Sequence, residues 1–532
     1  MAALTTAALV RAAGALALEP TARRFERAVA HPRHAQDRVL AQLVSATADT
    51  AYGRSVGLRD DDDYAAFARR VPIVKYEQLE PWIARQKERG GRVISPQSAA
   101  LYEKTSGSSG GKKYIPYTPA LMRSFHRMIF VWLHDLLRHG PAFRTGKVFF
   151  SISQPFHSPE TTGDGTRVGM DDDLDYISPL TRLLIGSRFV NPPGIARLRN
   201  PAGYRRVLAC ALLAEHDLEI ISIWNPTYLT TLLDYIATHR DALLGDLRRQ
   251  TITVEDRRFH LAPIAAERAA LLAAGAPWPQ IWPALKLISC WTDGTAAYFA
   301  ERLYREFPGV AIQGKGLLAT EAPMTVPLIG AAAPVPMVDE VLFELEDEAG
   351  AIHRLHDAKL GASYQLIISQ RSGLLRYRIG DRVEIVGHHR ATPCLRFLGR
   401  AGDVSDLVGE KLNAEFVHAA LTRVFAARDS FSFLVPVRRE GEPSYYCCVT
   451  TAPTTAASAA ALEAELATAH HYDQARKLDQ LGPVRITVAS HARDAYYDHH
   501  MSRGMKWGDI KFSPLLKTAD DGLMRRLGVL AA

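Results

Sequence analysis

Two hydrophobic patterns divide the chain, and each predicts a different secondary structure. Over residues 20–88, 202–216 and 243–274, apolar residues recur every three or four positions, which predicts helices. Short apolar runs at 147–153 and 218–224 predict buried strands between those helices. This alternation of helices and strands is typical of an α/β fold with a mostly parallel sheet.

The pattern changes towards the carboxyl end. Residues 285–313 continue the α/β part, whereas residues 338–397 alternate apolar and polar positions and predict a β-rich layer of antiparallel strands. The last 130 or so residues predict helices and strands of a small α+β domain. We therefore expect an α/β protein, with mixed sheets and a β-rich layer in a large domain over residues 1–402 and a small domain over residues 403–532.

Length and composition narrow the class of protein. The chain has 532 residues and 47% hydrophobic content, which are typical of a soluble globular protein. No apolar run approaches the roughly 18 residues of a membrane span, and the Ala/Leu-rich start lacks the basic stretch of a signal peptide. We expect a cytoplasmic protein that does not bind membranes.

Charge and cysteine content argue against other classes. The net charge is +7, but basic residues are spread along the chain with acidic residues between them. A small anionic substrate explains this excess as well as a nucleic acid does, so we expect no nucleic-acid partner. Five cysteines without a C-x-x-C pair indicate neither a disulfide framework nor a zinc site. The paired histidines and short aspartate runs lack the spacing of a metal site.

The segment from Thr105 to Lys113 contains hydroxyls, glycines and two lysines, with no apolar residue. Its glycines allow backbone N–H groups to point towards an anion, its hydroxyls can donate to phosphate oxygens, and a lysine adds positive charge. A flexible linker has a similar composition. However, a predicted strand precedes this segment and an amphipathic stretch follows it, which favours a binding loop. The candidate anion ligands are Thr105, Ser106, Gly107, Ser108, Ser109, Gly110, Gly111, Lys112 and Lys113.

Four further polar motifs follow the loop. Thr320 and Glu321 come after a predicted strand, at the edge where α/β sheets bind ligands, and the Glu321 carboxylate can hold Mg²⁺ beside phosphates. Asp381 follows a glycine turn and can accept both hydroxyls of a ribose, although such a residue alone is more often a turn cap. Arg400 lies near the predicted domain boundary, and Lys511 lies in a glycine-flanked loop.

The order of these motifs resembles the adenylate-forming superfamily of acyl-CoA synthetases, peptide-synthetase adenylation domains and luciferases. Over nearly its whole length the chain is similar to the auxin-responsive Gretchen Hagen family of acyl-acid amido synthetases. The matching segments are residues 71–81, 281–283, 292–298, 361–366, 373–381 and 480–484. Ala319 and Thr320 stand where plant members have two serines, and Gly399-Arg400 is retained, as in a bacterial-type member.

The resemblance implies an enzyme that uses ATP and Mg²⁺. It would activate a carboxylic acid as an acyl-adenylate, release pyrophosphate, and transfer the acyl group to an amine, in particular an amino acid, with release of AMP. The expected partners are these small molecules, and the expected oligomeric state is a monomer. An acyl- or aryl-CoA ligase and a catalytically silent adenylate-binding module stay open as alternatives. The sequence does not choose the acid.

The resemblance also implies residue roles. The loop from Ser106 to Gly111 would hold the β- and γ-phosphates, Glu321 the Mg²⁺ and Asp381 the ribose. Arg400 would contact the ribose or phosphate near a hinge at 400–406, about which the small domain rotates. Lys511 would reach the α-phosphate and the carboxylate oxygens, with Lys506 and Lys517 as competing lysines.

The adenine and acyl groups would be framed by two segments, 292–295 and 313–319, which include Thr292 and Gly316. The wall of the acyl site is less defined by the sequence. Its candidates are Trp224, Asn225, Tyr228, Leu229 and the stretch 130–137. Such residues at helical spacing belong to a hydrophobic core more often than to a binding site.

Overall fold

The computed structural model describes residues 2–530, apart from 107–111, 151–159, 170–187, 295, 401–403, 409, 411, 426–429, 439–441, 504, 506–509 and 519. The chain divides into two compact units. Unit 1 consists of Met1–Asp293 and Leu303–Leu398, and unit 2 consists of Gly294–Arg302 and Gly399–Ala532.

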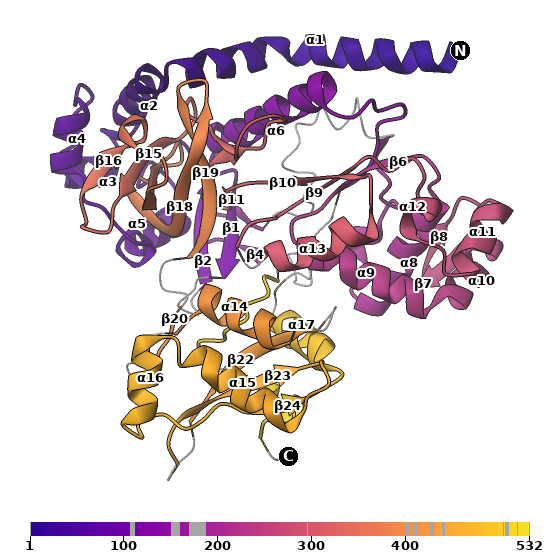
Figure 1. Ribbon diagram of the computed structural model, residues 1–532. Helices are drawn as coiled ribbons and strands as arrows, with labels where there is room; N and C mark the ends of the chain where they lie inside the picture. The colour runs from indigo at the N-terminus through magenta and orange to yellow at the C-terminus, as the bar shows by residue number, and fades with distance from the viewer. Residues whose placement is uncertain are drawn as a thin grey trace. The chain divides into compact units, whose positions relative to one another are not determined.

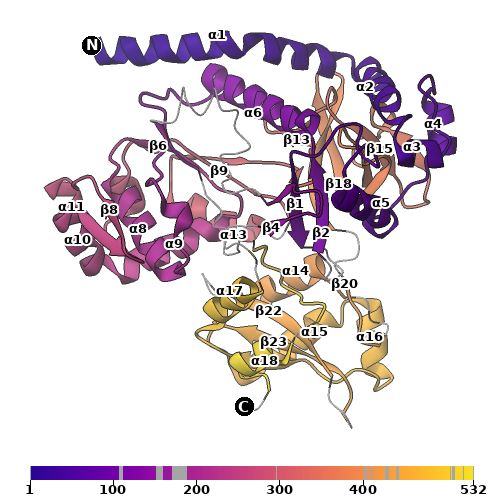
Figure 2. The ribbon, with the colours of Figure 1, turned by 180° about the vertical axis from the view of Figure 1, so that it is seen from behind.

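Unit 1 begins with helices, as the helical periodicity predicts. They are α1 (Ala2–Ala30), α2 (Pro32–Thr47), α3 (Ala51–Ser55), α4 (Tyr64–Arg70) and α5 (Tyr76–Arg89). Side-chain oxygens cap two of them, because Thr50 accepts a hydrogen bond from the Gly53 N–H and Asp63 accepts one from the Ala66 N–H. Helix α1 lies along α6 (Pro119–His139) (Figures 1 and 2). Among the residues described, no helix combines the length and hydropathy needed to cross a membrane.

A four-stranded sheet carries the two strands that flank the predicted phosphate loop. Its strands are β1 (Leu101–Ser106), β2 (Lys112–Tyr117), β4 (Glu160–Thr161) and β5 (Arg167–Val168), in the order β2-β1-β5-β4. Strands β1 and β2 form an antiparallel hairpin in which Ser106 faces Lys112. Helix α6 follows β2 directly, because the Thr118 hydroxyl caps its first turn by accepting from the Leu121 N–H.

The expected parallel sheet is present in the middle of unit 1. Strands β3 (Lys147–Phe150), β6 (Leu218–Ser222), β9 (Leu287–Cys290) and β10 (Ala311–Gly314) lie in the order β10-β9-β6-β3, and every neighbouring pair is parallel. The associated helices are η3 (Ile195–Arg197), α8 (Pro201–Ala214), α9 (Pro226–Thr238), α10 (Arg240–Arg249), α11 (Ala266–Ala273) and α12 (Trp278–Ile281). Helix α13 (Ala296–Glu306) begins in unit 2 and ends in unit 1. All four strands therefore end at the same edge.

The prediction of continuous helices over 243–274 is wrong in its middle. A hairpin of β7 (Thr251–Val254) and β8 (Arg257–His260) separates α10 from α11. The β-branched run Thr-Ile-Thr-Val favours a strand. The turn residues Glu255 and Asp256 have φ of 49° and 61°, the two positive angles that a tight hairpin turn requires.

A five-stranded antiparallel sheet forms the predicted β-rich layer. Its strands are β15 (Leu342–Glu346), β16 (Ile352–Arg354), β17 (Ser363–Ser369), β18 (Tyr377–His389) and β19 (Thr392–Arg400), in the order β16-β15-β17-β18-β19; the 3₁₀ turn η4 (Leu355–Asp357) follows β16. Leu366 and Val383 on this sheet belong to one hydrophobic core with Phe25 of α1 and Ile115 of β2. The phosphate-loop hairpin and the antiparallel sheet thus share a core.

Unit 2 contains the α+β fold that the sequence predicts. Its elements after β19 are β20 (Val404–Ser405), β21 (Leu412–Asn413), α14 (Ala414–Val424), β22 (Ser432–Val437), β23 (Tyr445–Thr450), α15 (Ala456–Leu466), α16 (His470–Lys477), β24 (Arg485–Val488), α17 (Ala492–Ser502) and α18 (Asp521–Arg526). Strand β23 lies between β22 and β24, antiparallel to the first and parallel to the second. Leu421, Leu434 and Tyr446 are in its separate core.

Candidate active site

The predicted phosphate loop connects β1 to β2. Thr105 lies opposite Lys113 across the hairpin, so the structure places both ends of the loop side by side. Gly107, Ser108, Ser109, Gly110 and Gly111 lie outside the described residues. The Tyr76 hydroxyl accepts a 2.7 Å hydrogen bond from the Tyr114 N–H, and the Lys113 ammonium lies 5.4 Å from the centre of the Tyr76 ring. Tyr76 therefore fixes the start of β2.

Thr320 and Glu321 form the two-residue tip of a small hairpin. Its strands are β11 (Leu318–Ala319) and β12 (Ala322–Pro323), in antiparallel register. The Tyr117 hydroxyl at the end of β2 donates a 2.8 Å hydrogen bond to the Thr320 carbonyl. On the other side, the Tyr377 hydroxyl of β18 lies 3.4 Å from Glu321 Oε1 as a donor. Glu321 is buried, with 5% of its surface exposed.

Asp381 lies in a distorted part of β18. The register between β17 and β18 pairs Gln365 with Arg382 and Ile367 with Arg378, so β18 contains extra residues at this point. Gly380 takes φ of 90°, which a side chain would strain. Asp381 is buried on the same face as Tyr377, although that face is otherwise apolar. A bulge that re-aims a side chain is common next to binding sites.

Thr292 and the segment after β10 lie at the carboxyl edge of the parallel sheet. A Cβ on Gly314 would fall 2.3 Å from the Thr292 hydroxyl, so the Thr292 side chain lies against the Gly314 backbone. Gly316 has φ of 71°, and a Cβ there would collide with Thr325 and Pro334. The structure thus brings Thr292 next to Gly314, and the hairpin tip with Thr320 follows a few residues later. Thr295 lies outside the described residues.

Arg376 is a structural residue of this region that the sequence analysis missed. Its guanidinium is buried and bonds the Glu344 carboxylate at 2.8–3.1 Å, as well as the carbonyls of Ala68 and Val71. Its own carbonyl accepts from the Val74 N–H. Arg376 therefore holds the strand start that carries Tyr377. An arginine within the apolar run from Leu374 to Ile379 was the available signal.

The two remaining cationic candidates belong to unit 2. Arg400 ends β19. The Lys511 side chain is exposed, whereas its neighbours Ile510 and Phe512 are buried. The Tyr496 hydroxyl accepts from the Ser513 N–H at 3.1 Å, which fixes the backbone next to Lys511. Of the competing lysines, Lys517 is also exposed and Lys506 lies outside the described residues.

The candidates for the acyl wall divide into two groups. Tyr228 and Leu229 are 3% and 0% exposed, and Asn225 caps α9 by accepting from the Thr227 N–H. These three residues belong to the core and the helix start rather than to an open surface. Trp224 is partly exposed, as is Trp132 within the 130–137 stretch.

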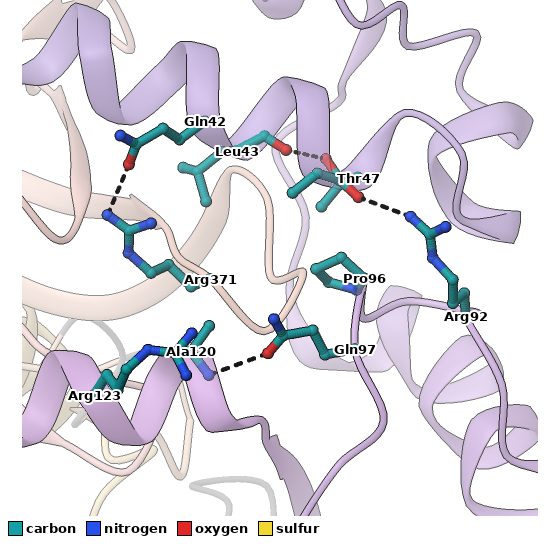
Figure 3. A pocket seen from close by; sticks show the side chains of 10 residues that line it. Gln42, Leu43, Thr47, Arg92, Pro96, Gln97, Ala120, Arg123 and Arg371 are labelled. Atoms are coloured by element: carbon teal, nitrogen blue, oxygen red, sulfur yellow. Dashed lines mark hydrogen bonds between the residues drawn. The ribbon is translucent and has the colours of Figure 1, made fainter.

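A separate cavity of about 330 Å³ lies near the end of α2 (Figure 3). Its lining residues are Gln42, Leu43, Ala46, Thr47, Arg92, Pro96, Gln97, Ala120, Arg123 and Arg371. Arg371 bonds Gln42 and the Glu340 carboxylate at 2.9 and 3.1 Å, so its charge is engaged within the fold. None of the predicted adenylation residues lines this cavity.

The models of one protein family match most of the residues of both units. The GH3 family N-terminal domain matches residues 21–312, its central domain matches 338–400 and its C-terminal domain matches 415–520. The chain belongs to the GH3 family. This is the Gretchen Hagen family whose motifs the sequence resembles.

Two similar relatives from plants are amido synthetases by name. A probable indole-3-acetic acid-amido synthetase GH3.2 of Oryza sativa subsp. japonica is 23% identical over 91% of this chain and 89% of its own length. Indole-3-acetic acid-amido synthetase GH3.4 of Arabidopsis thaliana is 21% identical over 93% of this chain and 92% of its own.

The solved structure of GH3.15 acyl acid amido synthetase has the same fold. It superposes with a TM-score of 0.82 at 21% identity, over 96% of this chain and 95% of its own. A second structure, of AtGH3.15 acyl acid amido synthetase in complex with 2,4-DB, gives the same TM-score at 20% identity, over 97% and 96% of the two chains. The fold class predicted from the sequence, an α/β fold with mixed sheets, a β-rich layer and a smaller carboxyl-terminal α+β domain, is confirmed.

Proposed function

We propose that this GH3-family chain is an ATP-dependent acyl-acid amido synthetase. It activates a carboxylic acid as an acyl-adenylate with release of pyrophosphate, and transfers the acyl group to the amine of an amino acid with release of AMP. The amido synthetase names of its GH3 relatives support this class of ligase.

The observation that carries the proposal is the convergence of three motifs on Glu321. Tyr117 joins the strand after the phosphate loop to the tip that bears Glu321, and Tyr377 joins that tip to β18. Asp381 follows Tyr377 on the same buried face of β18. Motifs that are far apart in the sequence are thus fastened to one hairpin tip, as a common nucleotide site requires.

The described residues fit the ligands of this reaction. In phosphate-transfer sites Mg²⁺ is commonly held by one or two carboxylates together with substrate phosphates and waters. The described residues contain no cluster of three or more His, Cys, Asp or Glu, so Glu321 fits such a site as a single protein carboxylate. When bound there, Mg²⁺ would neutralise charge on the phosphates of ATP.

In the first half-reaction, the carboxylate oxygen of the acid attacks the α-phosphorus of ATP. The bond from that phosphorus to the bridging oxygen breaks, and pyrophosphate leaves. We assign the β- and γ-phosphates to the loop from Thr105 to Lys113, and the ribose hydroxyls to the Asp381 carboxylate. Lys511 of unit 2 supplies positive charge to the α-phosphate, and Arg400 contacts the ribose or phosphate. Catalysis then rests on positioning and on neutralising charge.

In the second half-reaction, the amine nitrogen attacks the carbonyl carbon of the acyl-adenylate and loses a proton. The bond from that carbon to the phosphate oxygen breaks, so AMP leaves and an amide forms. We further propose that unit 2 moves about a hinge at 400–406 between the two steps. We also propose, from the sequence, a domain boundary at residue 402, a cytoplasmic location and a monomeric state.

The direct test is pyrophosphate release with ATP, Mg²⁺ and a panel of aromatic, indolic and aliphatic acids. Each acid that is activated is then offered an amino-acid mixture, hydroxylamine or CoA as acceptor. Amide formation from amino acids supports the proposal, whereas thioester formation alone would reassign the chain as a CoA ligase. Lys511→Ala should abolish pyrophosphate release, and Lys477→Ala, which removes an exposed lysine of α16, should not.

A further inference from the structure

The cavity near the end of α2 is lined by arginines and by no acidic side chain. Of the ten described residues that line it, three are arginines and none is Asp or Glu (Figure 3). Arg92 comes from the segment between α5 and β1, Arg123 from the start of α6, and Arg371 from the turn between β17 and β18. All three belong to unit 1. A cavity in which polar groups converge is typical of a small-molecule site.

The carboxylate that pairs with Arg371 is shared with a second arginine. Glu340 accepts from Arg371 at 3.1 Å and also accepts from Arg127, so one negative charge serves two guanidinium groups. Burial lowers the pKa of Arg127, and nearby arginines, Arg123 among them, lower it further against the opposing charge of Asp339. Positive charge is therefore in excess beside the cavity.

Arg92 and Arg123 are the two lining arginines whose charge the fold does not neutralise. Neither forms an ion pair with a carboxylate of the described residues, and both side chains are exposed. Arg92 makes one 3.4 Å hydrogen bond, to the Ala46 carbonyl near the end of α2. A guanidinium group in this state has N–H groups left to bond an oxyanion, and it bonds phosphate with two parallel N–H groups.

The two glutamines of the cavity add donors rather than acceptors. The Gln42 side-chain oxygen accepts from Arg371 at 2.9 Å, and the Gln97 side-chain oxygen accepts from the Ala120 N–H at 3.2 Å (Figure 3). The polar atom that remains on each amide is the NH₂ group, which only donates. The arginines and glutamines thus offer donors to a ligand, as an anion requires.

We propose that this cavity binds a small organic phosphate, whose oxygens accept from the guanidinium groups of Arg92 and Arg123. The amides of Gln42 and Gln97 are further donors. A phosphate monoester carries a charge of about −1.5 to −2 at pH 7 and three strong acceptor oxygens, so it matches several donors better than a carboxylate does. The volume of about 330 Å³ is at the small end for ligand sites, which favours a compact ligand such as a sugar phosphate.

This site is additional to the proposed active site, since none of the predicted adenylation residues lines it. Calorimetric titration of the full chain, at a low and fixed ionic strength, tests it with two matched sets of probes. One set is glucose 6-phosphate, glucose and glucuronate, and the other is glycerol 3-phosphate, glycerol and glycerate. In at least one set the phosphate should bind about 10-fold or more tightly than the carboxylate, and the uncharged compound should give no binding heat.

Variants of the unpaired arginine then locate the binding. Arg123→Met should weaken the phosphate about 10- to 100-fold, and Arg123→Lys should restore part of the loss because it keeps the charge. Arg138→Met removes an exposed arginine about 22 Å further along α6, and it should bind as the wild type. Arg123 has no partner among the described residues, so thermal melting should show each variant folded.

The predicted phosphate loop is the competing place for a phosphate, and Lys113→Met separates the two. This variant should keep the wild-type affinity for the probe. Binding that is lost in Lys113→Met and unchanged in Arg123→Met would assign the probe to the loop and overturn the proposal. An absence of binding by both phosphates to the folded wild type would also overturn it, as would equal affinities for phosphate and carboxylate in both sets.

Discussion

The Tyr117 hydroxyl donates a 2.8 Å hydrogen bond to the Thr320 carbonyl, and this bond fastens the end of the phosphate-loop hairpin to the tip that carries Glu321. Tyr117 is only 1% exposed, and its ring stacks on Phe125 of α6 at 5.7 Å. The ring is therefore fixed by packing, and its hydroxyl links the strand to the tip.

Tyr117→Phe should keep the ring packing and remove the bond. Because the Thr320 carbonyl loses a partner, we expect a loss of about 1 kcal/mol in the free energy of unfolding. The rate of pyrophosphate release should fall roughly 10- to 100-fold, since a small displacement of a catalytic group is costly. Phe125→Leu is the matched control, because it perturbs the stacking and leaves the bond. If Tyr117→Phe lowers stability but not the rate, the bond has no role in positioning the tip.

Glu321→Gln should remove the negative charge of the hairpin tip with little change in volume. If Glu321 is the carboxylate that holds Mg²⁺, pyrophosphate release should fall by at least about 100-fold, and the Mg²⁺ concentration for half-maximal rate should rise. Glu348→Gln removes a carboxylate whose side chain is 86% exposed in a turn, and it should behave as the wild type. Equal Mg²⁺ dependence of Glu321→Gln and the wild type would contradict the assignment.

The antiparallel sheet illustrates what the sequence could and could not predict. Alternation of apolar and polar residues predicts strands over 338–397, because one face of each strand packs on the core. The same reasoning cannot foresee the bulge at Gly380 or the buried position of Asp381, since both depend on the register with β17. The order of motifs, and not the residue itself, indicated Asp381 as a ligand, and the fold supplies its buried position.

The candidate site shows the same limit. Glycine and hydroxyl content indicated the phosphate loop, and the order of motifs indicated Thr320, Glu321 and Lys511. The sequence does not predict the role of the tyrosines that join these motifs, because Tyr117 and Tyr377 resemble ordinary strand residues. Their role arises from contacts between segments some 200 and 56 residues apart, which no local pattern records.

Arg376→Met should destabilise unit 1 strongly. The Arg376–Glu344 pair is buried, with side chains 7% and 1% exposed, and the Tyr64 hydroxyl also donates to Glu344. Removal of one partner leaves a buried charge, so we expect a loss of about 3–5 kcal/mol in the free energy of unfolding. Arg23→Met breaks an exposed pair in α1 and should cost under about 1 kcal/mol.

A double variant tests whether the charge causes this loss. Arg376→Met combined with Glu344→Gln removes the unpaired carboxylate, and it should recover part of the stability lost in Arg376→Met, as measured by chemical unfolding. No recovery would show that the bonds of Arg376 to the Ala68 and Val71 carbonyls are the larger contribution.

His500 should make unit 2 sensitive to acid. Burial lowers the pKa of this imidazole from 6.5 to about 4, and the neighbouring His499 and Arg503 act in the same direction, opposed by Asp520. Its Nε2 is buried and has no hydrogen-bond partner among the described residues. As the pH falls from 6.5 towards 4, this imidazole is protonated in the unfolded chain but stays neutral in the folded chain. The free energy of unfolding therefore falls over this window and levels off below it.

His500→Gln removes this titration, and hydrogen exchange of the peptides of α17, corrected for intrinsic rates, measures the result. The variant should lose less stability than the wild type between pH 6.5 and 4, whatever its stability at neutral pH. His470→Gln, an exposed histidine at the start of α16, should retain the acid sensitivity of the wild type. Because Asp520 and His499 remain in His500→Gln, an unchanged pH profile would assign the acid sensitivity to those groups and not to the buried imidazole.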